Sequence, residues 1–203
     1  MNKTLFTLMA LATTLMISSC NQPSEKPSFE QVITSRRSVR SYDATKTISE
    51  AEVRTLLTAA QEAPSWANVE PTKYYVAMSE EKRAALLDLI GGNRRSAEGA
   101  PVLLVSTFEK GKSGFHRGEQ LSGIGESWGA YDNGLSNAFM ILQARAMGFD
   151  TLIMGVGENE AIRSLFDIPE NEMMMAVIAL GYRASEPSRP GRRPLDEIVK
   201  FYD

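Results

Sequence analysis

The sequence predicts a single α+β domain in which helices cover both faces of a sheet. Helical and strand-like segments are mixed along the chain, and no internal repeat is present. Two continuous apolar runs, 102–105 and 173–180, have the length of strands that are buried on both faces. With 203 residues, of which 43% are hydrophobic, the chain is long enough to form one well-buried core.

Two capping-box patterns mark the starts of the first two helices. Gln31 follows Ser28 by three residues, and Glu52 follows Ser49 in the same way, so each pair can exchange hydrogen bonds between side chain and backbone. The second helix carries one apolar stripe and ends before Pro64, whose ring is incompatible with a helix interior.

Hydrophobic periodicity places the remaining elements. We expect strands over 73–78, 102–105, 151–154 and 173–180, and helices over 79–90, 127–147 and 159–166. The longest of these helices has Leu135, Phe139, Leu142 and Ala146 on one face. Residues 110–127 are rich in Gly and Ser and predict a long loop, which in a compact domain is often functional.

The first twenty residues have the composition of an export signal. Lys3 gives a short charged start, residues 5–17 are almost entirely apolar, and Cys20 follows shortly after them. The apolar part is too short to span a bilayer comfortably as a helix. The segment resembles a bacterial lipoprotein signal, in which cleavage before the cysteine leaves its thiol to be acylated.

This resemblance divides the chain into three expected parts. They are a signal peptide over 1–19, a flexible tether over 20–28 and a folded domain over 29–203. The resemblance implies that the lipidated Cys20 anchors the protein in the bacterial cell envelope and provides its only contact with a membrane.

The charge balance excludes several kinds of partner and site. The formal net charge is −3 and the pI is about 5.4, so the chain lacks the broad positive field that nucleic-acid binding needs. His116 is the only histidine, and the only cysteine, Cys20, serves as the anchor, so we expect no metal site and no disulfide. Catalysis would have to come from a cofactor, a carboxylate or a hydroxyl group.

The most informative pattern is the run 35–42, which follows the first predicted helix. Arg36, Arg37 and Arg40 can donate bidentate hydrogen bonds and stay protonated, and Ser38 adds a neutral donor at closer range. Together these side chains suit a compact dianion such as a phosphate monoester. Taken alone, the run also fits a solvated basic loop that binds nothing, because short basic runs are common on surfaces.

A second pattern, 63–71, lies between a helix end and a strand. Its turn presents backbone groups and the amide of Asn68, which match the donors and acceptors at the edge of a heterocycle. Taken alone, it is a loop bounded by Pro64 and Pro71. A third basic cluster, 189–195, lies in a tail (185–203) that is rich in Pro and Arg and ends with an amphipathic piece.

Four motifs in order make the chain resemble the nitroreductase family of flavoenzymes. They are Arg-Arg-Ser-Val-Arg at 36–40, Ala-Pro-Ser-x-x-Asn-x-x-Pro at 63–71, Gly-Phe-Asp-Thr-Leu-Ile-Met-Gly at 148–155 and Arg-Arg-Pro-Leu at 192–195. The resemblance covers nearly all of the chain after the tether. It implies an α+β fold with a central, mostly antiparallel sheet flanked by helices and an extended C-terminal arm, and FMN bound at the interface of an intertwined homodimer.

The resemblance also implies the residues that bind FMN. The run and the C-terminal arginines would hold the phosphate, the loop 63–71 would line the isoalloxazine ring, and residues 154–156 would meet the flavin near N5. The expected cofactor-binding residues are Arg36, Arg37, Ser38, Arg40, Pro64, Ser65, Asn68, Met154, Gly155, Val156, Arg189 and Arg192. No protein side chain is expected to be catalytic, because the flavin carries the chemistry.

The implied function is an FMN-dependent oxidoreductase. It would move two electrons from NAD(P)H or another donor to nitroaromatic, quinone or similar small-molecule acceptors by a ping-pong mechanism. Many family members have Gln-Pro-Trp where this chain has Glu70-Pro71-Thr72, and a glycine where it has Val156, so acceptor preference is left open. The alternative is an envelope-anchored flavin-binding or interaction protein with little turnover, because nicotinamide nucleotides are not expected to be plentiful outside the cytoplasm.

Overall fold

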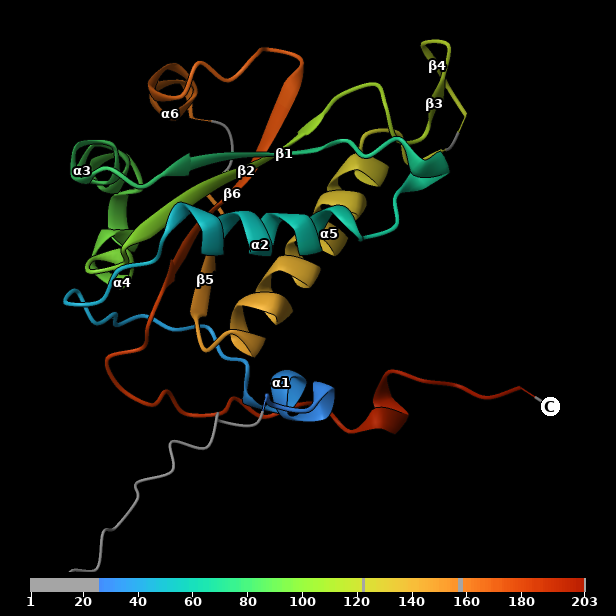
Figure 1. Cartoon of the computed structure of the whole chain (residues 1–203). Helices are drawn as coiled ribbons and strands as arrows, with labels where there is room; N and C mark the ends of the chain where they lie inside the picture. Colours follow the sequence, from blue (N-terminus) through green and yellow to red (C-terminus); the bar gives the residue numbers. More distant parts are fainter. Residues whose placement is uncertain (1–25, 122, 157–158, 203) are drawn as a thin grey trace, which may run out of the picture.

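The structure of the protein is a computed structural model that describes residues 26–121, 123–156 and 159–202 (Figure 1). Its centre is a four-stranded antiparallel sheet with helices on both faces, which confirms the predicted fold class. In sheet order the strands are β1 (Thr72–Ala77), β2 (Val102–Glu109), β6 (Glu172–Gly181) and β5 (Asp150–Met154). The expected signal and the lipidation site Cys20 lie outside the described residues.

The two central strands, β2 and β6, contain the two apolar runs of the sequence, and each contributes buried side chains to both faces of the sheet. Leu103 and Val105 of β2 belong to one buried cluster, whereas Val102 and Leu104 belong to the other. This alternation follows from the two-residue period of a strand. A strand between two apolar layers needs apolar residues at successive positions, which is why these segments show no polar alternation.

Helices supply the other half of each cluster. On one face lie α2 (Glu50–Gln61) and α5 (Ser127–Ala146), and on the other lie α3 (Glu80–Leu89), α4 (Arg94–Ala97) and α6 (Glu160–Leu165). The short helix α1 (Phe29–Ser35) contacts α5. Short 3-10 helices are present at η1 (Trp66–Asn68), η2 (Gly91–Asn93) and η3 (Leu195–Glu197).

Both predicted capping boxes are present. The hydroxyl of Ser28 accepts the backbone N–H of Gln31, whose side chain accepts from the backbone of Ser28 at 2.7 Å. Ser49 and Glu52 repeat the arrangement at the start of α2. Each cap is worth about 1 kcal/mol, and together they fix where the chain enters α1 and α2.

The helix α5 approaches the sheet closely and buries a polar face. A Cβ added at Gly129 would lie 2.3 Å from the ring of Phe108, so only glycine fits there. The buried side chains of α5 include Asp132, Asn133 and Asn137. The apolar face that the periodicity predicted is turned outward, and Phe139 on this face is 39% exposed.

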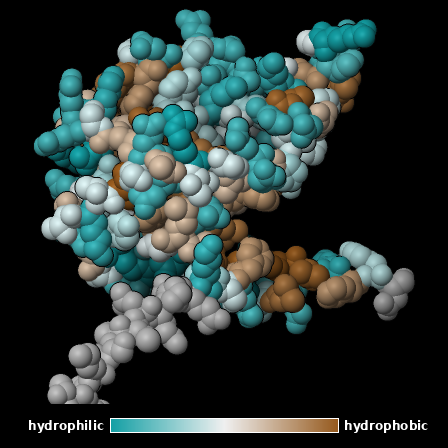
Figure 2. Space-filling view, viewed as in Figure 1, coloured by the Kyte–Doolittle hydropathy of each residue, from teal (hydrophilic) through white to brown (hydrophobic). Residues whose placement is uncertain are grey.

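Two segments differ from the expected loops and tail. Residues 110–126 contain a small hairpin formed by β3 (Phe115–His116) and β4 (Glu119–Gln120). The C-terminal arm follows the sheet, is hydrogen-bonded to Ser41 through the N–H of Ala184, passes Arg37 at Arg189, and has η3 as its short helical part. Figure 2 shows hydrophobic side chains along this arm; its exposed apolar residues are Leu195, Ile198, Phe201 and Tyr202. Within the described ranges, no helix is long and apolar enough to span a membrane.

Candidate functional site

The arginine run lies at an edge of the sheet, beside β5. Ser38 forms a parallel bridge with Thr151, and the N–H of Val39 donates to the carbonyl of Thr151 at 3.0 Å. The side chain of Val39 is 1% exposed, whereas Ser38 and Arg40 on either side of it are exposed. In extended backbone, neighbouring side chains point to opposite sides, so burying Val39 turns the polar residues outward.

The run carries more positive charge than its surroundings neutralise. Arg37 donates from Nη1 to the carbonyls of Thr34 and Arg36, at 2.7 Å each, and its Nε is buried without a partner. Partial burial and the nearby guanidinium of Arg189 lower the pKa of Arg37. Arg36, Arg37 and Arg189 form no ion pair with any residue that the structure describes. The carboxylate that acts on Arg37 belongs to Glu186, which pairs with Arg183, so the cluster can bind a further anion.

A buried acid supports this cluster from the inside. Asp150, 3% exposed, accepts two hydrogen bonds from the guanidinium of Arg183 at 2.5 and 2.7 Å and a longer one from Arg145. These hydrogen bonds raise the pKa of Arg183. Arg145 also donates to the hydroxyl of Ser35 at 3.0 Å. Asp150, together with Arg145, therefore links the start of the arm, the end of α5 and the end of α1, and these elements support the run.

The loop 63–71 has an unusual backbone. Ala67, Asn68 and Glu70 have φ angles of 48°, 57° and 48°, which lie in the left-handed region that residues with a Cβ disfavour. The hydroxyl of Ser65 accepts the N–H of Glu70 at 3.0 Å, and the side-chain amide of Asn68 donates to the carboxylate of Glu70 at 3.2 Å. The backbone N–H of Trp66 donates to the carboxylate of Asp132 at 3.0 Å.

In the folded chain, the run and the loop lie at opposite ends of α5. Ser35, next to the run, contacts Arg145 near the C-terminal end of α5, whereas the loop contacts Asp132 near its N-terminal end (Figure 1). Thirteen residues of α-helix separate these two contacts, which corresponds to about 20 Å at 1.5 Å per residue. The fold thus gathers Arg36, Arg37, Ser38 and Arg189 in one place and holds Pro64, Ser65 and Asn68 in another.

The other predicted cofactor-binding residues take intermediate positions. Met154 ends β5 and is buried, Gly155 is exposed, and the half-buried Val156 packs against the apolar cluster under α3 and α6. Arg40 borders a depression that it shares with residues 95–99. Arg192 is exposed and donates to the carbonyls of Pro190 and Gly191 in its own arm.

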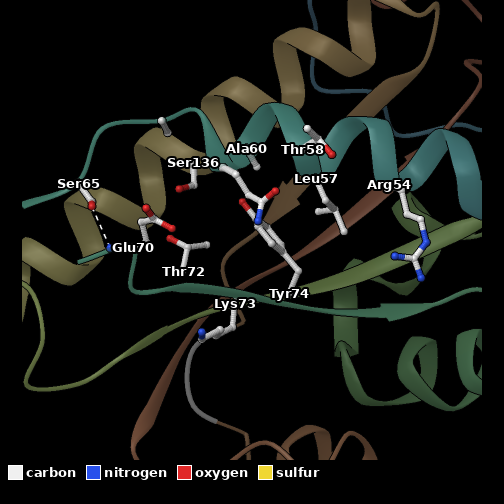
Figure 3. Close-up of a pocket in the computed structure, with 12 residues that line it drawn as sticks. Arg54, Leu57, Thr58, Ala60, Ser65, Glu70, Thr72, Lys73, Tyr74 and Ser136 are labelled. Atoms are coloured by element: carbon white, nitrogen blue, oxygen red, sulfur yellow. Dashed lines mark hydrogen bonds between the residues drawn. The ribbon is translucent and has the colours of Figure 1, made fainter. Parts of the chain in front are cut away.

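The loop borders an open cleft between α2, β1 and α5 (Figure 3). The cleft has a volume of about 430 Å³, and its lining includes Ser65, Glu70, Thr72, Tyr74 and Ser136. The hydroxyl of Thr72 is buried without a hydrogen-bond partner. One side of the loop therefore faces space that a small molecule can enter.

Because Thr72 stands where many family members have a tryptophan, another tryptophan could line the flavin pocket. Both tryptophans of the chain, Trp66 and Trp128, are half-buried. Trp66 begins η1 in the loop itself. Trp128 packs edge to face against Tyr131, with ring centroids 5.7 Å apart, and its indole Nε1 is buried without a partner. Of the two, Trp66 is the one that belongs to the expected flavin loop.

Sequence patterns did not reveal the polar residues that hold these segments in place. Besides Asp132 and Asp150, a buried network joins β2, α5 and β1, and its members are Ser106, Asn133, Asn137 and Tyr74. The available signal was the pair of amides Asn133 and Asn137 on the helix face opposite the predicted apolar stripe, with Asp132 at the border of that stripe. No cluster of His, Cys, Asp or Glu suitable for a metal ion occurs among the residues that the structure describes.

Comparison with known proteins finds relatives in sequence and in structure. The NADH dehydrogenase of Thermus thermophilus is 26% identical over 188 residues, which cover 81% of this chain and 91% of that protein. Two solved structures share the fold of the present chain at lower sequence identity. One, from Exiguobacterium sibiricum, is described as a nitroreductase in complex with FMN, with a TM-score of 0.76, 22% identity and coverage of 87% of this chain and 98% of that chain.

The second structure is an NADPH:FMN oxidoreductase from Vibrio harveyi complexed with NAD+. Its TM-score is 0.70 at 20% identity, and the similarity covers 86% of this chain and 77% of that chain. The family model described as the nitroreductase family matches residues 33–182, which is well over half of the 203 residues. This match extends from the end of α1 to the end of the sheet, and the chain therefore belongs to the nitroreductase family.

Proposed function

We propose that the protein is an FMN-dependent oxidoreductase that takes two electrons from NAD(P)H and delivers them to nitroaromatic, quinone or similar acceptors. Family membership supports the cofactor and the reaction class, and the names of its relatives support the nicotinamide donor. The observation that carries the proposal is the guanidinium cluster at the sheet edge, because it gathers positive charge that forms no ion pair among the described residues and includes a buried donor without an acceptor.

The residues of the run fit the phosphate of FMN. Arg36, Arg37 and Arg189 form no ion pair among the described residues, and the buried Nε of Arg37 is a donor without an acceptor. A phosphate monoester supplies several acceptor oxygens and up to two negative charges, which is the complement of this cluster. Ser38 is exposed beside it and would add a hydroxyl donor.

The loop fits the other end of the cofactor. Its backbone groups and the amide of Asn68 can donate and accept at the edge of the isoalloxazine ring. When bound, FMN supplies the redox chemistry by accepting two electrons from a donor and passing them to an acceptor. The protein's part is to bind the phosphate, orient the ring and leave space for each substrate in turn, which is the basis of the proposed ping-pong order.

We infer that two protomers complete each site. The outer face of α5 carries Tyr131, Leu135, Phe139 and Leu142, which are half-buried or exposed and lie along one side of the helix. An apolar groove formed with Pro27 and residues of α1 continues this surface. An exposed apolar surface of this kind is typical of an interface between copies.

A two-fold axis across the middle of α5 would run the two copies of this helix antiparallel. The N-terminal end of one copy, with its loop 63–71, would then lie beside the C-terminal end of the other copy, with its arginine run. This arrangement brings together the two groups of residues that a single protomer keeps apart, and it gives the exposed arm a partner surface.

We also propose that Cys20 is lipidated and holds the domain 29–203 in the cell envelope. The support is the order of residues 1–20, with a charged start, an apolar stretch and a cysteine. Growth with radiolabelled palmitate should label the wild-type protein, and Cys20→Ser should abolish the label and release the protein from the membrane fraction. Equal labelling of both proteins would contradict the proposal.

The enzymatic proposal is tested by anaerobic titration of purified protein that begins at residue 26. We expect a yellow protein whose visible flavin absorbance is lost on addition of NADPH or NADH and returns with a quinone or a nitroaromatic compound. Bound flavin that neither nucleotide reduces would favour the flavin-binding alternative instead. Protein that binds no FMN at all would refute the proposed function.

A further inference from the structure

Three segments of the chain meet at one buried carboxylate. Asp132 lies in the first turns of α5 and is 2% exposed. Its Oδ2 accepts the backbone N–H of Trp66 at 3.0 Å and the hydroxyl of Ser113 at 2.6 Å. Trp66 belongs to the loop 63–71, and Ser113 to the segment between β2 and the hairpin, so Asp132 ties both segments to the helix.

The loop is the segment that most needs this support. Its three non-glycine residues with positive φ, Ala67, Asn68 and Glu70, hold a conformation that persists only where surrounding contacts impose it. The bond between Ser65 and Glu70 joins the loop to itself, whereas the bond from Trp66 to Asp132 joins it to the helix. Hydrogen bonds to a charged acceptor are roughly twice as strong as those between neutral groups, which suits an anchor for such a backbone.

We propose that Asp132 is a positioning residue for the flavin ring, acting through the backbone of Trp66. The inference rests on the proposed function, in which the loop lines the isoalloxazine of FMN. The Asp132 carboxylate holds the start of η1, and η1 in turn fixes where Ser65 and Asn68 present their polar groups. Asp132 lies behind the loop and is not assigned to the chemistry itself.

The hydrogen bond between Trp66 and Asp132 can be removed without substituting Asp132. Trp66 is the first residue of η1 and has helical backbone, and Ser65 before it is extended with φ −135° and ψ 161°. The backbone at positions 65 and 66 is compatible with proline, which removes the N–H donor and places its ring Cδ where that hydrogen pointed, so the carboxylate of Asp132 must also move away. Trp66→Pro therefore deletes the bond to Asp132, and the matched control Trp66→Ala deletes the same indole but keeps the N–H.

We expect Trp66→Pro to bind FMN about tenfold or more weakly than Trp66→Ala, the size expected for losing a hydrogen bond to a charged group. Flavin fluorescence titration measures the FMN affinity. Steady-state kcat and KM for NAD(P)H, measured at saturating FMN, show whether the bound ring is misplaced. We expect kcat to fall in the proline variant while circular dichroism of the two proteins stays alike. Equal FMN affinity and equal kcat in the two variants would overturn the inference.

A second pair of variants tests the carboxylate directly. Asp132→Asn keeps one acceptor oxygen, so we expect its FMN affinity to lie between those of the wild type and Asp132→Ala. If the alanine variant fails to fold, the two Trp66 variants still decide. Wild-type protein without FMN affinity would remove the proposed function together with this inference, whereas wild-type binding with indistinguishable Trp66 variants would remove only the inference.

Discussion

Arg36 is the residue at which a single substitution should separate cofactor binding from folding. It caps α1 with its backbone, while its half-buried guanidinium has no ion-pair partner among the described side chains. Arg36→Ala should therefore weaken FMN binding roughly ten- to a hundredfold, the size of a lost hydrogen bond to a charged group, and should change the unfolding temperature little.

The control for this variant is an arginine in another setting. Arg94 on α4 is exposed and pairs with Asp88. Arg94→Ala should leave FMN affinity at the wild-type value, as measured by fluorescence titration. Equal weakening in both variants would mean that general surface charge, and not a built phosphate site, attracts the cofactor.

Tyr75 gives a prediction for alkaline pH. Burial and its hydrogen bond to the carboxylate of Glu172 raise the pKa of Tyr75 from 10.0 to about 12. The folded protein thus holds this phenolic proton more tightly than the unfolded chain does. The stabilisation is present below pH 10 and is lost as the pH rises toward 12.

The unfolding temperature should accordingly fall less steeply over this range in Tyr75→Phe, although the variant starts from lower stability. Tyr202, which is 87% exposed, provides the matched control, and Tyr202→Phe should keep the wild-type slope. Thermal unfolding at a series of alkaline pH values measures both slopes. A wild-type slope in Tyr75→Phe would show that this phenol does not limit alkaline stability.

At the residue scale, sequence patterns could propose binding residues that lie within one motif, but they did not reveal polar residues whose partners lie far away in the chain. Arg37 and Ser38 are neighbours, so their shared chemistry was visible in the run. Asp132 and Asp150 gain their roles from Trp66 and Arg183, which are far away in sequence. No local pattern marks a carboxylate whose donors arrive only after folding.

At the scale of elements, the contact between α5 and β2 carries the sharpest stability prediction. Gly129→Ala would place a Cβ 2.3 Å from the ring of Phe108, which is itself fully buried, so helix and strand must separate. We expect a loss of about 1–3 kcal/mol in the free energy of unfolding, as for other overpacked cores. Chemical denaturation measures it.

Gly92 in η2 is the control for this variant. A Cβ added there meets nothing within 4 Å, and its backbone does not have a positive φ. Gly92→Ala should leave the free energy of unfolding within about 0.5 kcal/mol of the wild type, as surface substitutions usually do. Equal stability of the two alanine variants would show that α5 is free to shift away from the sheet.

The structure confirms the helices and strands that the sequence predicted. They could be predicted because periodicity and capping are local signals. What periodicity could not decide is which face of α5 meets the sheet. The stripe that the periodicity predicted is turned outward. The side that faces the sheet combines the apolar residues Met140, Ile141 and Ala144 with the amides Asn133 and Asn137, which bond to β2. A helix with one apolar face and a partly polar opposite face can be oriented only with knowledge of its partners.

At the scale of the whole molecule, the exposed arm leads to a prediction about assembly. Its apolar residues, Leu195, Ile198, Phe201 and Tyr202, are 61–87% exposed in one protomer. Replacing all four with Ser should shift the protein toward monomer, because each buried apolar side chain contributes about 1.5–3 kcal/mol to an interface. Sedimentation velocity measures the shift.

Lys200 on the same arm supplies the control. Lys200→Ala removes an exposed charge and no apolar surface, so its dimer should be as stable as the wild type. A quadruple Ser variant that remains as dimeric as Lys200→Ala would mean that the arm plays no part in assembly. The sequence could predict this arm from its Pro and Arg content, but not a surface that covers it, because in the proposed dimer that surface would belong to a second molecule.

The central claim is that FMN binds where the run of one protomer meets the loop of another. Complementation between Arg36→Ala and Asn68→Ala, assayed at an FMN concentration too low to load either parent dimer, tests it directly. In a mixed dimer, one site would receive both substitutions and the other site would receive neither. We predict that co-expressed, separately tagged protomers, purified as mixed dimers, recover one FMN per dimer and NAD(P)H-dependent turnover that neither parent dimer shows. Mixed dimers as inactive as both parents would contradict a site shared between two protomers.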